Sequence, residues 1–203
     1  MFGAVLSKID GTEFIYDDVL DNSGVPKEYS YKHILPKVIN QGSDPICVPC
    51  SISSWLNWKI NTIYASNKDN KIKLFDIFEN GNGGDDGMTC KAAFKYLIDC
   101  GAKYDNGNYK LSKYYKINSG PALKHALISN GPCVAVLPVY NESLEFWKNY
   151  GENFLGYHAI SIVGYDEKGF IIRNSWGESF GRKGYTYIKN EDLNKFVEIW
   201  TLC

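Results

Sequence analysis

Pro49 is the residue that most restricts how the first long apolar segment of this chain can fold. Proline has no backbone N–H and fits into an α-helix only in its first turn. The segment that follows, from Ser51 to Ala65, carries large apolar side chains at helical spacing. The pattern therefore predicts a helix that begins near Cys47, and it places Cys47 at the end where the helix dipole is positive.

The order of the helical and strand patterns predicts an α+β fold with two lobes. Thr89 is placed to cap a second helix that ends near Cys100, and Pro121–Ser129 is typical of a short third helix. We expect an N-terminal arm over residues 1–28 and a domain over residues 29–203, divided into a helical lobe at 45–110 and a β lobe at 111–203. The predicted strands are Val134–Val139, Ala159–Tyr165, Phe170–Arg173, Tyr185–Lys189 and Val197–Leu202.

The composition argues against several classes of function. A net charge of −1 gives no basic surface for nucleic acid. No apolar run reaches the length of about 18 residues that a membrane span needs, and the first residues make a poor secretory signal, so we expect a cytoplasmic protein without a membrane partner. The six cysteines include no second C-x-x-C and no histidine pair to complete a metal site, so we expect no metal and no cofactor.

Cys47 is the candidate nucleophile of the chain. A thiol attacks a carbonyl carbon as the thiolate, and a helix N-terminus and a nearby imidazolium both lower the pKa of a cysteine. The base must then be one of three histidines. His33 lies in an irregular segment and His125 on a surface-like helix, whereas His158 opens an apolar strand.

Four motifs, in order along residues 40–185, resemble those of the papain family of cysteine peptidases. Gln41 precedes Cys47 by six residues, as the oxyanion-hole glutamine of that family precedes its nucleophile. His158-Ala159-Ile160-Ser161 is similar to the family's histidine strand. The other two motifs are the glycine loop Gly81-Asn82-Gly83-Gly84 and the run Asn174-Ser175-Trp176-Gly177, which Gly181 and Gly184-Tyr185 follow at the family's spacing.

The resemblance implies a papain-like two-lobe fold, with an active-site cleft between the helical lobe and an antiparallel, β-barrel-like lobe. It implies a peptidase in which Cys47 is the nucleophile, His158 the general acid and base, Asn174 the residue that orients the imidazole, and Gln41 the oxyanion donor. The substrate would be a peptide or protein. The residues that would contact it are Gly83, Gly84, Asp85, Ala159 and Trp176, and Trp176 would also shield the bond between His158 and Asn174 from water.

The chain departs from the family pattern at the glycine loop and at the N-terminus. Asp44 and Gly81 stand where many relatives have a disulfide, which fits a reducing compartment. Asp85 and Asp86 follow the two glycines, which motivates the hypothesis that the second residue on the acyl side of the cut is preferably basic. Because only about 28 residues precede the expected domain, we expect no long propeptide. This apolar arm either lies over the cleft and inhibits the enzyme or packs elsewhere, and a proteinaceous inhibitor is a further candidate partner.

A simple hairpin does not bring the expected orienting residue to the histidine. With a plain turn at residues 167–168, Asn174 lies opposite Ser161, three residues from His158. That offset is about 10 Å along a strand. The contact between Asn174 and His158 therefore requires a strong twist or an altered register.

Two other functions remain alternatives. Cys47-Val48-Pro49-Cys50 is a C-x-P-C run at a helix start, as in thiol–disulfide oxidoreductases, although no preceding apolar strand frames it. A papain-like acyl transferase, or a hydrolase of cell-wall peptides, would use the same four residues.

The variant Cys50→Ser separates the peptidase from the dithiol alternative. We expect it to keep peptide hydrolysis, because the second thiol has no part in acyl transfer, whereas a redox dithiol would lose its activity. Fluorogenic peptide hydrolysis and insulin reduction, assayed on the same preparation with Cys47→Ser as the inactive control, measure both outcomes.

Overall fold

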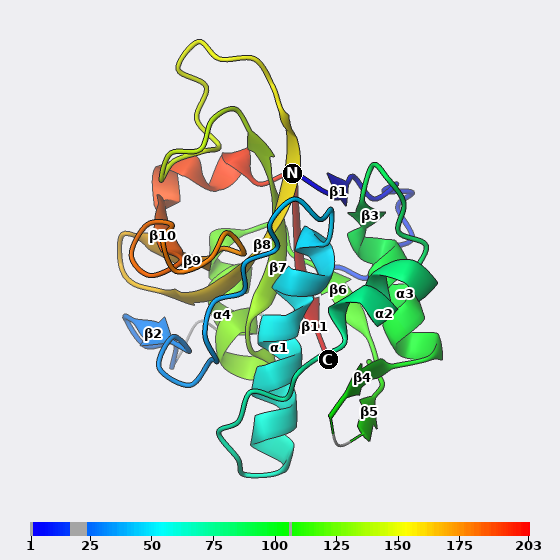
Figure 1. Ribbon diagram of the computed structural model, residues 1–203. Helices are drawn as coiled ribbons and strands as arrows, with labels where there is room; N and C mark the ends of the chain where they lie inside the picture. Colours follow the sequence, from blue (N-terminus) through cyan, green and yellow to red (C-terminus); the bar gives the residue numbers. More distant parts are fainter. Residues whose placement is uncertain (1, 17–23, 106) are drawn as a thin grey trace.

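The computed structural model describes residues 2–16, 24–105 and 107–203. Helix α1 (Cys47–Ile63) runs through the middle of the molecule, with its first turn beside the start of the chain (Figure 1). Pro49 lies in that first turn, and Cys50 N donates to Ile46 O at 3.0 Å. The predicted start of this helix at Cys47 is confirmed.

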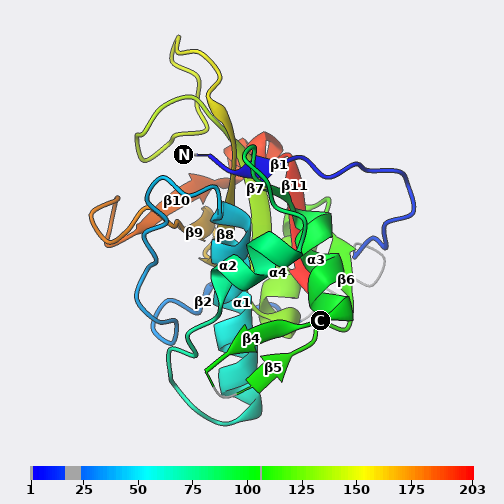
Figure 2. The same cartoon turned by 45° about the vertical axis from the view of Figure 1, so that its right-hand side comes forward.

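Two further helices and a small hairpin lie on one side of α1 (Figure 2). Helix α3 (Cys90–Asp99) begins as predicted, with the Thr89 hydroxyl accepting from Ala92 N at 3.1 Å. Helix α2 (Leu74–Asn80) was not predicted, because it has only seven residues and buries only Ile77, so it shows no apolar stripe. The hairpin consists of β4 (Ala102–Tyr104) and β5 (Gly107–Tyr109).

The other side of α1 faces the main sheet, whose strands follow the order β10-β9-β8-β7-β11-β6. Helix α4 (Gly120–Asn130), which Ser119 caps, contacts β7, β8 and β11. The predicted α+β class is confirmed, as are all five predicted strands apart from shifts of one to three residues at their ends. The bounds are β6 (Tyr114–Lys116), β7 (Cys133–Val139), β8 (Gly156–Tyr165), β9 (Gly169–Arg173), β10 (Tyr185–Lys189) and β11 (Glu198–Leu202), with a 3₁₀ turn η2 (Asn190–Lys195) before β11.

A one-residue bulge interrupts the pairing of β8 with β9. Ile162 pairs with Ile172 but Gly164 pairs with Ile171, so Val163 is the extra residue. Ser161 consequently lies opposite Arg173, and the plain register with Asn174 opposite Ser161 is wrong. Tyr31 N donates to the carbonyl of Val163 at 2.9 Å, which satisfies the backbone group that the bulge takes out of the ladder.

The N-terminal arm adds strands to the sheet. Strand β1 (Ala4–Val5) pairs in parallel with β3 (Met88–Thr89), and Ala4 also pairs with Tyr157 of β8. Further along the arm, Ile15 forms a bridge with Lys116. Just after the arm, β2 (Tyr29–Ser30) pairs with the far end of β8. Residues 1 and 17–23 of the predicted arm lie outside the described part of the chain.

Helix α1 and strand β8 form the interface on which the rest packs. The Ser161 hydroxyl contacts Ser51 O at 2.7 Å and Ser54 Oγ at 2.8 Å, so the polar groups of this buried interface are paired. Throughout the described residues, the helices are too short or too polar to cross a membrane.

The cap of α3 gives a direct test of the helical part. Replacing Thr89 by alanine removes the acceptor for Ala92 N, and we expect the free energy of unfolding to fall by about 1 kcal/mol. Thr89→Ser keeps the hydroxyl, so its free energy of unfolding should stay close to that of the parent protein. Urea denaturation measures both, and equal loss in the two variants would contradict the capping role.

Candidate active site

Cys47 is the first residue of α1 and its side chain is fully buried. Its Sγ accepts the N–H of Ala159, from the middle strand β8, at 3.4 Å. Burial raises the pKa of this thiol, because a thiolate loses its hydration, while the N–H groups of Ala159 and Gly3 act in the opposite direction. The sulfur therefore lies against β8, one residue from His158.

His158 is held by Asn174 through a hydrogen bond of 2.7 Å between Nε2 and Oδ1. Because Asn174 Oδ1 also accepts from Ser175 N, the amide is fixed with its oxygen toward the ring, and Nε2 carries the proton. The other ring nitrogen, Nδ1, is buried and has no hydrogen-bond partner among the described residues. Nδ1 is thus the atom left to exchange a proton with the thiol of Cys47.

The bulge at Val163 explains how Asn174 reaches His158. Side chains alternate between the two faces of a strand, so a register shift of one residue moves a side chain to the other face. In the plain register Asn174 would share a face with Ser161, which points at α1. After the bulge it lies level with Ile160, on the same face as His158 and two residues away.

Aromatic rings cover the imidazole. Trp176 stacks on His158 with centroids 4.8 Å apart, and Phe146 and Phe2 approach its edge at 5.8 Å and 6.2 Å. His158 is 0% exposed, and this burial lowers its pKa to about 4, although the bond to Asn174 acts to raise it. In this arrangement the imidazole is neutral near pH 7.

Gln41 joins the loop before α1 to the segment after β9. Its Oε1 accepts from Ser175 Oγ at 2.6 Å, its Nε2 donates to Asp44 O at 2.8 Å, and its backbone N donates to Ser175 O at 2.9 Å. The side chain is 3% exposed. These bonds orient the amide beside the N-terminus of α1, where Cys47 contributes its own backbone N–H.

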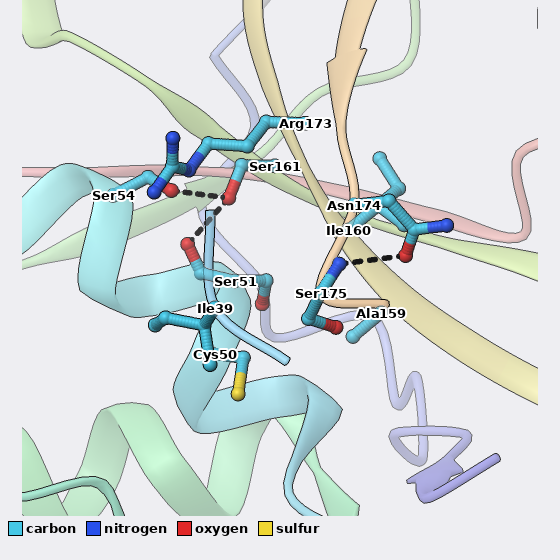
Figure 3. Close-up of a pocket in the computed structure, with 10 residues that line it drawn as sticks. All are labelled: Ile39, Cys50, Ser51, Ser54, Ala159, Ile160, Ser161, Arg173, Asn174 and Ser175. Atoms are coloured by element: carbon cyan, nitrogen blue, oxygen red, sulfur yellow. Dashed lines mark hydrogen bonds between the residues drawn. The ribbon is translucent and has the colours of Figure 1, made fainter. Parts of the chain in front are cut away.

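The floor behind the site is shown in Figure 3, where the Ser161 hydroxyl of β8 bonds to the backbone carbonyl of Ser51 and to the Ser54 hydroxyl of α1. The Cys50 thiol also lies there and is almost fully buried. Burial, and secondarily the charge of Cys47, raise the pKa of Cys50. A redox dithiol needs at least one accessible thiol of low pKa, so this geometry disfavours the oxidoreductase alternative.

The start of the arm lies in this site. Gly3 passes so close to neighbouring backbone that a Cβ on it would be 2.2 Å from Pro45 O, and a Cβ on Gly87 would be 2.0 Å from Gly3 O. Met88 N donates to Gly3 O at 2.9 Å. Phe2 reaches the rings of His158 and Trp176. The arm therefore covers Cys47 and His158 through contacts that only glycines at these two positions permit.

The glycines expected to meet a substrate have different surroundings. A Cβ on Gly83 would clash with the Phe78 ring at 2.6 Å, so packing against α2 requires this glycine. Gly84 faces open space, and Asp85 is exposed in the turn that the two hydrogen bonds between Gly84 and Gly87 close. Sequence reasoning missed the close approach at Gly87, although its place at the end of the same glycine-rich run was a signal.

Acidification should release the arm. An imidazole with a pKa near 4 in the docked form and near 6.5 in water binds fewer protons when docked, so between these values the docked form loses stability as the pH falls. Across the whole range between these two pKa values, the free energy of docking changes by an amount on the order of 3 kcal/mol. Hydrogen-exchange protection of residues 2–5, corrected for intrinsic rates, should therefore decrease from pH 7 to pH 5.

The variant His158→Gln has no group that titrates in this range. Protection of residues 2–5 that fell equally in this variant would show that another group controls the docking of the arm.

Known proteins share both the sequence pattern and the fold. Cathepsin B-like CP1 of Giardia intestinalis is 36% identical over 121 residues, covering 49% of this chain and 40% of that protein. Macrodontain-1 of Ananas macrodontes is 31% identical over 129 residues, covering 60% of this chain and 59% of that protein. The chain thus spans about half the length of these curated relatives.

A solved structure extends the similarity to the whole fold. Xylellain, a cysteine protease from Xylella fastidiosa, has a TM-score of 0.83 at 19% identity, over 99% of this chain and 95% of that one. The expected papain-like, two-lobe fold is therefore confirmed. Residues 46–199 also match the family model described as papain family cysteine protease. Because this match covers most of its length, the chain belongs to the papain family of cysteine proteases.

Proposed function

We propose that this protein hydrolyses peptide bonds, with Cys47 as the nucleophile and His158 as the acid and base. The observation that carries the proposal is the hydrogen bond from His158 Nε2 to Asn174 Oδ1, which leaves the other ring nitrogen, Nδ1, without a partner among the described residues. The next residue of the same strand, Ala159, donates its backbone N–H to the Cys47 sulfur. This arrangement supports a triad in which Asn174 orients His158 and His158 acts on Cys47, as acyl transfer by a cysteine nucleophile requires.

The proposed reaction passes through a thioester. The thiol proton moves from Cys47 to His158 Nδ1, and the sulfur attacks the carbonyl carbon of the peptide. The resulting oxyanion accepts hydrogen bonds from the Cys47 N–H and the Gln41 amide, and removing one such donor from an acyl-transfer site costs about 3 kcal/mol. The imidazolium protonates the leaving amine, and water activated by His158 then hydrolyses the thioester.

The bound peptide would contact both sides of the site. Because His158 delivers the proton to the leaving amine, the leaving group lies toward Trp176, which stacks on that imidazole. The acyl part then lies toward Ala159 and the glycine loop. Gly84 faces open space there, so a peptide backbone has access to it, with Asp85 beside it on the rim.

We propose further that the docked arm is an inhibitor and not a substrate. The amide of Gly3 presents its N–H to the Cys47 sulfur, while its carbonyl oxygen accepts from Met88 N at 2.9 Å. The Gly3 carbonyl oxygen is thus held by the backbone of the chain beside the glycine loop, which supports a docked inhibitor over a bound substrate. The arm also removes water from the thiol and the imidazole, which keeps both neutral.

The six cysteines support the proposal that the protein works in a reducing compartment such as the cytoplasm. All six are free thiols, and four of them are buried. Asp44 and Gly81 occupy the positions where many relatives have two disulfide-bonded cysteines, so that disulfide cannot form in this chain.

Removing residues 2–9 tests both proposals. The truncated chain should hydrolyse fluorogenic peptides at least about ten times faster than the full chain, since Cys47 and His158 regain solvent and the cleft is open. A synthetic peptide of residues 2–9 should inhibit it competitively. Labelling by an epoxide inhibitor, located by peptide mapping, should fall on Cys47, and Cys47→Ala should lose both labelling and hydrolysis.

The outcomes separate the two proposals. Equal turnover by full-length and truncated chains would exclude inhibition by the arm but not the peptidase. A truncated chain that remains folded by circular dichroism but neither cuts peptides nor reacts at Cys47 would exclude the peptidase.

A further inference from the structure

The run Cys47-Val48-Pro49-Cys50 contains a second thiol that the proposed peptide hydrolysis does not use. Cys50 lies one turn after Cys47 in α1 and is almost fully buried. Its burial disfavours an oxidoreductase, because such an enzyme must offer an accessible dithiol to its protein substrates. A disulfide within the run is compatible with this burial, since only Cys47 has to meet a small oxidant.

The backbone of α1 holds the two cysteines at a separation that a disulfide can bridge. Residues three apart in an α-helix have Cα atoms about 5 Å apart, and disulfides span about 4.4–6.8 Å between Cα atoms. The turn is fixed, because Cys50 N donates to Ile46 O at 3.0 Å and the ring of Pro49 restricts the backbone. The two sulfur atoms can therefore meet by side-chain rotation, without movement of the helix.

Both thiols lie against the same residue of β8. The Cys47 sulfur accepts the N–H of Ala159 at 3.4 Å. Cys50 and Ala159 lie among the residues around one small cavity between α1 and β8 (Figure 3). Burial and the charge of Cys47 both raise the pKa of Cys50, so the two thiols are close enough to interact. They thus occupy neighbouring positions on one face of the helix.

A buried cation lies beside Cys50. Arg173 lines the same cavity, and hydrogen bonds of 2.8 Å hold its guanidinium to the loop before α1 and to the Tyr185 hydroxyl. Its charge acts to lower the pKa of Cys50, against burial and the charges of Cys47 and Asp44. A Cys50 thiolate, formed while a bond to Cys47 forms or breaks, is therefore stabilised by Arg173.

Cys90 is a second buried thiol in the neighbourhood of Cys47. It is the first residue of α3 and belongs to the same buried apolar cluster as Cys47. Burial raises the pKa of Cys90, and the charges of Glu198, a buried carboxylate of β11, and of Cys47 raise it further. Because Cys90 lies near a carboxylate and Cys50 near a guanidinium, Cys50 gives up its proton more readily.

We propose that Cys47 and Cys50 form a reversible disulfide when a hydroperoxide oxidises the nucleophile. The inference rests on the proposed function, in which the arm leaves and Cys47 becomes a reactive thiolate. The thiolate attacks the terminal oxygen of the hydroperoxide, so that an S–O bond forms and the O–O bond breaks. Cys47 becomes a sulfenic acid, and the departing hydroxide or alkoxide takes the proton that the imidazolium of His158 holds.

The second step closes the disulfide. The Cys50 sulfur attacks the Cys47 sulfur, the S–O bond breaks, and the hydroxyl group leaves as water with the proton of Cys50. The bond blocks the nucleophile but protects it, because a sulfenic acid without a nearby thiol is oxidised further to a sulfinic acid that thiols do not reduce. A dithiol reductant reverses the step by attacking the Cys47 sulfur and releasing Cys50.

The test treats the full chain with hydrogen peroxide, alkylates the remaining thiols under denaturing conditions and digests the product with trypsin. Cleavage after Lys37 and Lys59 gives one peptide, residues 38–59, that contains Cys47 and Cys50, whereas Cys90 lies in the peptide 74–91. Mass spectrometry should find peptide 38–59 without alkyl groups and lighter by two hydrogen atoms than its reduced form. Treatment with dithiothreitol before alkylation should restore both alkylation sites.

Two variants assign the thiol that closes the disulfide. In Cys50→Ser, sulfinic acid at Cys47 should be at least about ten times more abundant than in the parent chain, because no neighbouring thiol captures the sulfenic acid. Cys90→Ser is the matched control, since it removes another buried thiol from the same region. It should form the disulfide to the same extent as the parent chain.

The outcomes are distinct. A link between peptides 38–59 and 74–91 would assign the partner to Cys90 and overturn the inference. Sulfinic acid at Cys47 with Cys50 still alkylated, or a Cys47 that is not oxidised, would also overturn it, and these results need no variant that could misfold. The masses do not depend on peptide hydrolysis. A chain that forms the disulfide but cuts no peptide would therefore overturn the proposed function alone.

Discussion

The hydrogen bond between His158 and Asn174 depends on a single extra residue in the neighbouring strand. Without the bulge at Val163, Asn174 would follow the face of Ser161 and point toward α1. The bulge is stable because Tyr31 binds the carbonyl of Val163, and Val163 itself is buried beside Tyr185. A segment more than a hundred residues before the histidine thus sets the register on which the orientation of the imidazole depends.

Burial has opposite consequences for the fold and for the chemistry at this site. The ring stacked on His158 and the helix end at Cys47 give a rigid arrangement, but a dry one in which both groups are neutral. A thiolate and an imidazolium require water or mutual contact to be stable. In the proposed inhibition the arm would decide between the two conditions, because Phe2 packs against the imidazole and Gly3 contributes the N–H that binds the sulfur.

Much of the fold could be predicted from local signals. Pro49 predicted the start of α1, Thr89 predicted the cap of α3, and short apolar runs predicted five of the strands of the main sheet, β7 to β11. Helix α2 was not predicted because it buries only one residue and therefore shows no apolar stripe. The bulge was not predicted because its extra residue, Val163, is not of a type that is typical of a bulge. The candidate catalytic residues came from motif spacing. The buried carboxylate Glu198 lies beside apolar strand residues and shows its surroundings only once β11 is placed against β7.

The docking of the arm by backbone contacts has a kinetic consequence. Gly3, Gly87 and Met88 meet through main-chain atoms, so the arm fills the position that an added β-strand would take. It is also tethered to the same molecule by the bridge between Ile15 and Lys116. A short tether gives a local concentration on the order of millimolar. For the proposed peptidase, an incoming peptide would therefore compete with the arm at every turnover, and the occupancy of the cleft would depend on how long the arm stays away.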